Sequence, residues 1–166
     1  MEPAMTKTLT ATMLAVAAFA FTVPQLAHAA DTGPSTPGAQ DNLGPARAAI
    51  AAKQWRTAID ELKRVNDTAS ADWNNLMGYT HRKASPPDLE AAERYYAEAL
   101  RLNPKHRGAL EYSGELYLMK GDLATAEQRL AALDKACFLP CDEYRDLKSA
   151  VARYKAAGNR YLPTSY

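Results

Sequence analysis

The sequence is poor in the residues that most often carry enzyme chemistry. Its 166 residues include two cysteines and three histidines. Neither His81 nor His106 has a second histidine or a carboxylate at metal-ligand spacing on its own helix. No Ser/His/Asp set, glycine-rich phosphate loop or other catalytic motif is recognisable in the chain. These absences predict a protein that is not an enzyme and that holds no cofactor and no resident metal.

The chain also lacks an excess of charge of either sign. Its Lys and Arg residues number 20 and its Asp and Glu residues 19, which gives a formal net charge of +1. Proteins that bind nucleic acid usually carry a strongly basic face, so we expect no nucleic-acid partner. With 47% hydrophobic and 23% charged residues, the composition is typical of one folded domain rather than of a disordered chain or a polytopic membrane protein.

Long hydrophobic runs are missing except near the N-terminus. Lys7 is followed by an apolar stretch over residues 9–23 and then by the small-residue site Ala27-His28-Ala29. This order predicts a cleaved signal peptide over residues 1–29, with cleavage after Ala30 as the alternative. An uncleaved anchor is less favoured, because threonines interrupt the stretch and it is shorter than the ~20 residues of a spanning helix. We therefore expect a periplasmic or secreted protein with no stable membrane anchor.

The rest of the chain repeats with a period of 34 residues. Residues 30–44 are rich in Pro, Gly, Ser and Thr and are expected to form a flexible leader. The stretch Leu89–Pro104 then carries Ala92, Tyr96 and Ala99 at helical offsets. Matching positions lie 34 residues before and after these three: Ala58, Leu62 and Val65, then Ala126, Leu130 and Leu133. This period, with a helical pattern in each unit, is typical of a stacked two-helix repeat.

Helix ends follow from capping residues and helix breakers. We expect helices over residues 46–52, 55–65, 89–102 and 142–157, one from Ala71 or Asp72 to the turn Ser85-Pro86-Pro87-Asp88, one between Pro104 and Gly121, and one after Asp122. Asp72, Asp88 and Asp122 are expected N-caps, because their carboxylates can accept unpaired backbone N–H groups. Gly78 lies inside a helix, where glycine costs up to about 1 kcal/mol against alanine, so it predicts a close contact with the facing helix.

The repeated positions resemble the tetratricopeptide repeat (TPR) family, whose pattern is W-x2-L-G-x2-Y in the first helix and A-x3-F-x2-A with a closing P in the second. The second unit matches through Gly78, Ala92, Tyr96, Ala99 and Pro104, and the third through Leu110, Gly114, Tyr117, Ala126 and the Gly121-Asp122 turn. The first unit is weaker, with Ala46 at the glycine position. The resemblance implies an all-α, right-handed α-solenoid of three TPR helix pairs over residues 45–140.

The C-terminal part lies outside the repeats. The segment Cys-x3-Cys-x-Glu-Tyr-x2-Leu is similar to the ending of some small exported bacterial repeat proteins. A solenoid needs its open end covered, so we expect a capping helix over residues 141–158. Residues 159–166 are expected to form a flexible tail.

The resemblance also implies where a partner binds. In the TPR family the first helix of each pair lines a concave groove that holds extended peptides. The residues projected to bind a partner there are Asn75, Tyr79, Arg82, Lys83, Glu111, Tyr112 and Glu115, with Arg47, Ile50 and Met119 nearby. Asn75, Arg82 and Lys83 resemble part of the set with which some members hold a peptide carboxylate, whereas Glu111 and Glu115 depart from it. A charged peptide segment therefore fits this groove better than a free C-terminus. The alternative is that these are ordinary solvated positions.

The two cysteines, Cys137 and Cys141, bracket a Phe-Leu-Pro turn. An exported protein meets an oxidising compartment, which allows them to form a disulfide that orients the last helix. Their spacing differs from the C-x-x-C of thioredoxin-like sites, so a structural bond is favoured over a redox pair or a soft-metal site.

The sequence thus predicts a protein- or peptide-binding adaptor that is a monomer when free. One alternative is a soft-metal-handling protein that uses Cys137 and Cys141. The other is a structural subunit of an envelope assembly.

Overall fold

The computed structural model describes residues 41–162, and these residues form seven α-helices and no strand. The chain divides into two units, Met1–Gly33 and Pro34–Tyr166, and every described residue belongs to the second. The helices are α1 (Gly44–Ala51), α2 (Trp55–Val65), α3 (Ala71–Lys83), α4 (Leu89–Leu102), α5 (Arg107–Met119), α6 (Leu123–Ala136) and α7 (Asp142–Ala156). The all-α prediction is confirmed for this part of the chain. The expected signal peptide, residues 1–29, lies outside the described residues.

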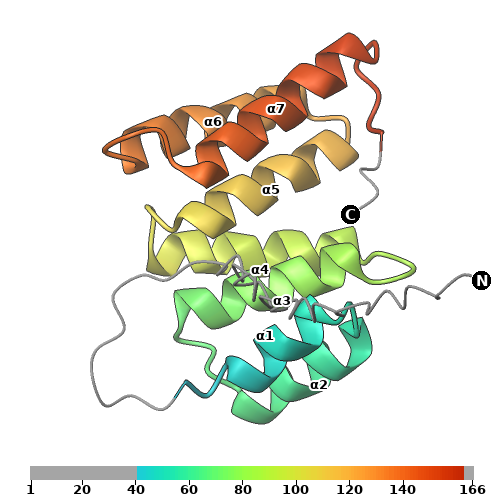
Figure 1. The fold of residues 1–166 in the computed structure, drawn as a ribbon, viewed down its shortest axis with the longest axis vertical. Coiled ribbons are helices and arrows are strands. Elements are labelled where there is room, and N and C mark those ends of the chain that lie inside the picture. Colours follow the sequence, from blue (N-terminus) through green and yellow to red (C-terminus); the bar gives the residue numbers. More distant parts are fainter. Residues whose placement is uncertain (1–40, 163–166) are drawn as a thin grey trace, which may run out of the picture. The chain divides into compact units, whose positions relative to one another are not determined.

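Each helix packs against the next one along the chain, and α5 also contacts both α3 and α7 (Figure 1). Helix α5 therefore lies next to both α3 and α7, although α4 separates it from α3 in sequence and α6 separates it from α7. This arrangement brings side chains from α3 and α5 together on one surface. No helix between residues 41 and 162 is long and apolar enough to cross a membrane.

The residues that repeat in sequence are those that pack. Ala58, Ala92 and Ala126 are fully buried. Leu62 and Tyr96, which follow the first two by four residues, are 0% and 1% exposed. A small residue on each second helix allows the facing helix to approach, and the larger residue one turn later fills the remaining space. The periodic sequence pattern therefore identifies residues of the hydrophobic core.

Gly78 of α3 marks a close approach to α4. A Cβ atom at this position would lie 2.7 Å from ring carbons of Tyr96 on α4. The predicted close contact with the facing helix is confirmed. Gly121 ends α5 with a φ of 81°, in the left-handed region expected at a helix C-terminus.

The predicted caps are confirmed at two of three helices. Asp88 accepts a hydrogen bond from the backbone N–H of Ala91 (2.9 Å) and Asp122 from that of Thr125 (3.0 Å). The prediction for Asp72 is wrong, because the cap of α3 is Ser70, whose hydroxyl oxygen accepts from the Trp73 N–H at 3.2 Å. Asp72 lies two residues after Ser70, within the first turn of α3, and has a different partner.

That partner is His106, which caps α5. Its Nδ1 accepts a hydrogen bond from the Ala109 N–H (3.1 Å), so the ring proton sits on Nε2, which donates to Asp72 at 2.9 Å. The hydrogen bond from His106 is the main reason why the pKa of Asp72 lies below its ordinary value. The start of α3 is thus tied to the start of α5.

Both ends of the described part differ from expectation. Asp41 accepts a hydrogen bond from the Leu43 N–H (3.2 Å) and pairs with Arg47, so residues 41–44 do not form part of a flexible leader as expected. The rest of the leader is outside the described residues. The expected flexible tail is wrong at Tyr161, which packs against the core formed by α5, α6 and α7. Residues 163–166 are not described.

Candidate functional site

Arg82, in the last turn of α3, is the centre of the site. Its side chain is 3% exposed, and its Nη2 lies 2.7 Å from Oε2 of Glu115 on α5. Its Nε also donates a hydrogen bond of 3.4 Å to the hydroxyl of Tyr96 on α4. Burial opposes the charge of Arg82, but Tyr96 and Glu115 outweigh it and raise the pKa of Arg82 above its ordinary value. The guanidinium is therefore charged and already bonded within the protein.

Two tyrosine rings flank this guanidinium. Tyr79 of α3 and Tyr112 of α5 have ring centroids 4.7 Å apart. The central carbon of the Arg82 guanidinium lies 5.6 Å from the centroid of Tyr79 and 5.7 Å from that of Tyr112. Trp55 of α2 meets Tyr79 edge-on at 6.3 Å. Burial raises the pKa of Tyr112, so its hydroxyl stays a protonated donor at neutral pH. A row of aromatic rings thus crosses from α2 to α5.

Glu111 of α5 is a mostly buried acidic residue. It is 7% exposed, and the described residues offer its carboxyl group no hydrogen bond and no ion pair. Burial raises the pKa of Glu111 to about 9; Glu115, Asp146 and Glu143 add to the rise and Arg82 opposes it. At neutral pH the group is therefore a buried, neutral carboxylic acid.

Asn75 and Lys83 complete the set of projected residues. Asn75 is 6% exposed, and its Nδ2 lies 3.1 Å from where a Cβ atom would sit at Gly108. Within residues 41–162 its Oδ1 is buried with no hydrogen-bond partner. Lys83 is partly buried; burial and then Arg82 lower its pKa, while Glu115 opposes the change.

The structure therefore brings the seven projected residues together on α3 and α5, and we call this surface the α3–α5 face. It comprises Asn75, Tyr79, Arg82, Lys83, Glu111, Tyr112 and Glu115. The alternative of ordinary solvated positions is wrong for Asn75, Arg82 and Glu111, which are buried. Arg82 also departs from the expected role as a contact for a peptide carboxylate, because Glu115 already occupies it. Partner binding at this face stays a prediction.

Sequence reasoning missed one member of the site. Tyr96 was predicted only as a repeating helical position, whereas its hydroxyl also accepts a hydrogen bond from Arg82. The phenol is a hydrogen-bonding end on a core residue, so the choice of Tyr over Phe at this repeat position was the available signal.

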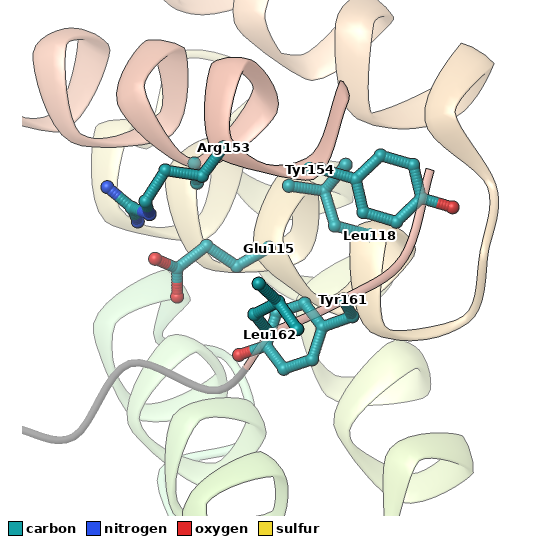
Figure 2. A pocket seen from close by; sticks show the side chains of 7 residues that line it. Glu115, Leu118, Arg153, Tyr154, Tyr161 and Leu162 are labelled. Carbon is teal, nitrogen blue, oxygen red and sulfur yellow. The ribbon is translucent and has the colours of Figure 1, made fainter. Parts of the chain in front are cut away.

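The chain after α7 borders the face at Glu115 (Figure 2). Tyr161 and Leu162 enclose a small cavity of about 20 Å³ together with residues of α5 and α7: Glu115, Leu118, Ala150, Arg153 and Tyr154. Figure 2 shows Arg153 and Tyr154 on one side of this cavity and Tyr161 and Leu162 on the other. A space of this size holds about one water molecule. It is therefore a packing gap beside the face and not a ligand pocket.

Cys137 and Cys141 form a disulfide bond, as favoured from the sequence. Potential ligand atoms of Cys137, Cys141 and Glu143 lie within 4.8 Å of one another, the one such set of three found among the described residues. Neither His81 nor His106 joins it. Both sulfur atoms are consumed by the disulfide, so this set offers thiolate ligands only after reduction.

No protein-family model matches this chain, and a search of curated proteins finds no significant match.

Proposed function

We propose that this chain is a non-enzymatic adaptor that binds a segment of a partner protein on its α3–α5 face. The proposed fold is a right-handed solenoid of three TPR pairs, α1/α2, α3/α4 and α5/α6, covered by α7. The contacts of α5 with both α3 and α7 support it, as does the burial of the repeating positions. The proposed location is the periplasm or the exterior, in keeping with the disulfide bond and with the predicted signal peptide.

The observation that carries the proposal is the carboxyl group of Glu111, which is mostly buried and takes part in no hydrogen bond or ion pair found among the described residues. A buried carboxyl group without a partner destabilises a folded protein. Groups of this kind are concentrated at binding and catalytic sites. The described residues near Glu111 form no catalytic set, so binding is the better interpretation.

The charges on the face indicate the chemistry of the partner. Arg82 is neutralised by Glu115, whereas Glu111 lies in the field of Glu115, Asp146 and Glu143. A Lys or Arg side chain of the partner would supply the missing charge. The rings of Tyr79 and Tyr112 would add cation–π attraction, which is worth about 0.5–2 kcal/mol. We therefore propose that the bound segment carries a basic residue that pairs with Glu111, and that Glu111 releases its proton on binding.

The test uses two fluorescein-labelled pools of capped dodecapeptides. One pool has a fixed central lysine and the other has norleucine there, with the remaining positions randomised. In fluorescence-polarisation titrations we expect the lysine pool to bind at least about tenfold more tightly, a difference of 1.4 kcal/mol. Glu111→Gln should remove the preference, whereas Glu90→Gln, at an exposed position of α4, should leave it intact. Equal binding of the two pools would contradict the proposed chemistry.

The soft-metal alternative keeps one observation in its favour, the closeness of Cys137, Cys141 and Glu143. It requires two free thiols in the protein as isolated. Thiol titration without reductant decides between the two: two reactive thiols support metal handling, and none supports the disulfide-bonded adaptor.

A further inference from the structure

A second surface stands out at the connection between α6 and α7. Phe138 is 101% exposed and Leu139 is 71% exposed, and the third large exposed hydrophobic residue in the described part is Leu162, at 62%. Two adjacent apolar side chains at a loop tip are unfavourable in water unless a partner covers them.

The loop that carries them is held at both ends. The disulfide bond between Cys137 and Cys141 closes it. The Cys137 N–H donates to the Leu133 carbonyl at 2.9 Å, and the Arg145 N–H donates to the Cys141 carbonyl at 3.2 Å, so both ends continue helices. Cys137 also packs against the core of α5, α6 and α7. The backbone is therefore pre-organised, which lowers the entropy that binding must overcome.

A hollow lies beside this loop. It is open to solvent and has a volume of about 490 Å³, and its lining consists of Lys105, Arg107, Ala136, Cys137, Phe138, Leu139, Pro140 and Cys141. The charged residues in this lining are both cations, and no carboxylate is among them. Lys105 is exposed, and Arg107 lies 3.5 Å from Glu143. None of the seven residues of the α3–α5 face lines the hollow, so the two surfaces are distinct.

We propose that this hollow is a second docking site, which takes a segment of a partner protein that places a large apolar side chain against Phe138 and Leu139 and a carboxylate beside Lys105. The apolar contact supplies most of the affinity, and the carboxylate fixes the direction of the segment. Together with the α3–α5 face, this site would let one chain hold two partners at once.

The probe is a random dodecapeptide library displayed on phage, selected on the wild-type protein with its disulfide intact and depleted on the double variant Phe138→Ser/Leu139→Ser. Both positions are exposed, so this variant should fold normally, which circular dichroism checks. We expect the enriched peptides to share an Asp or Glu within two positions of a large apolar residue. A synthetic copy of the best peptide should bind at least about tenfold more weakly to the double variant and to Lys105→Glu. Leu162→Ser, an exposed apolar change outside the loop, should bind it like the wild type.

Three results would overturn the proposal. The selection could recover no peptide that prefers the wild-type protein, or it could enrich peptides without an acidic residue near a large apolar one. The third such result is that the selected peptide binds the wild type and the double variant equally tightly. Co-sedimentation with phosphatidylglycerol vesicles that depends on Phe138, in the absence of peptide enrichment, would assign the loop to a membrane instead. Glu111→Gln should not change binding of the selected peptide, so failure here and failure at the α3–α5 face can be told apart.

Discussion

Replacing Glu111 by glutamine should stabilise the protein, and the gain should grow with pH. Glutamine has the shape of the neutral acid that the fold prefers at this position, but it cannot ionise. In the unfolded chain the carboxyl group titrates near 4.5, and in the folded protein burial and the neighbouring carboxylates raise its pKa to about 9. Between these two values the folded state holds a proton that the unfolded state has lost, so rising pH favours unfolding.

The size of the effect follows from the same two values. Stability falls by about 1.4 kcal/mol per pH unit across this window. At pH 7 the penalty in the wild type amounts to about 3 kcal/mol, an order-of-magnitude figure, and Glu111→Gln removes it. That gain corresponds to a rise in Tm of about 10 °C. Below pH 4.5 the acid is protonated in both states, and the variant and the wild type should be equally stable.

Urea unfolding followed by far-UV circular dichroism at pH 4.5, 6, 7 and 8 measures this dependence. Glu90→Gln, at an exposed position, is the matched control and should track the wild type at every pH. A difference between Glu111→Gln and the wild type that does not change with pH would refute the account of this residue. So would a loss of stability in the variant.

Three further changes test the packing around the site by urea unfolding. Glu115→Gln leaves the buried Arg82 charge without its carboxylate and should lower the free energy of unfolding by about 3 kcal/mol. Adding Arg82→Met should recover part of that loss. If the effects of the two substitutions simply add, the pairing is contradicted. Gly78→Ala should destabilise by about 1–3 kcal/mol, because the clash with the buried Tyr96 ring exceeds the gain of about 1 kcal/mol in helix propensity; a stabilised variant would show that the helices can separate. His106→Ala should cost about 1 kcal/mol or more through loss of the α5 cap, asparagine at this position should restore part of it, and equal loss in both variants would argue against a capping role.

The helices could be predicted from sequence because their signals are local. The observed bounds of α2 and α4 equal the predicted ones, and Asp88 and Asp122 cap the helices as expected. Asp72 shows where local reasoning ends. Ser70, and not Asp72, caps α3, and the carboxylate of Asp72 is instead bound by His106, which follows it by 34 residues.

The sequence could predict that the seven residues of the α3–α5 face lie on neighbouring helices, but it could not predict their contacts. The repeat register placed the seven residues on two first helices, and the structure brings these helices together. It could not show that Arg82 meets Glu115 and Tyr96, because these contacts join three helices. It also could not show that Glu111 is left without a partner, since that follows from where every neighbouring side chain ends. Arg82, the basic residue expected to contact a ligand, is bonded to Glu115 and Tyr96 within the protein. Glu111, an acidic residue of the same face, has no such bond.

Calorimetry of proton release tests the central claim most directly. The lysine-centred peptide pool is titrated into the protein at pH 7 in two buffers that differ in ionisation enthalpy, and the difference in heat gives the number of protons released per peptide bound. Pairing of a basic side chain with Glu111 predicts a release approaching one proton in the wild type and none in Glu111→Gln. Binding without proton release in the wild type, or equal release in the variant, would contradict the assignment of this face as a site for a basic partner segment.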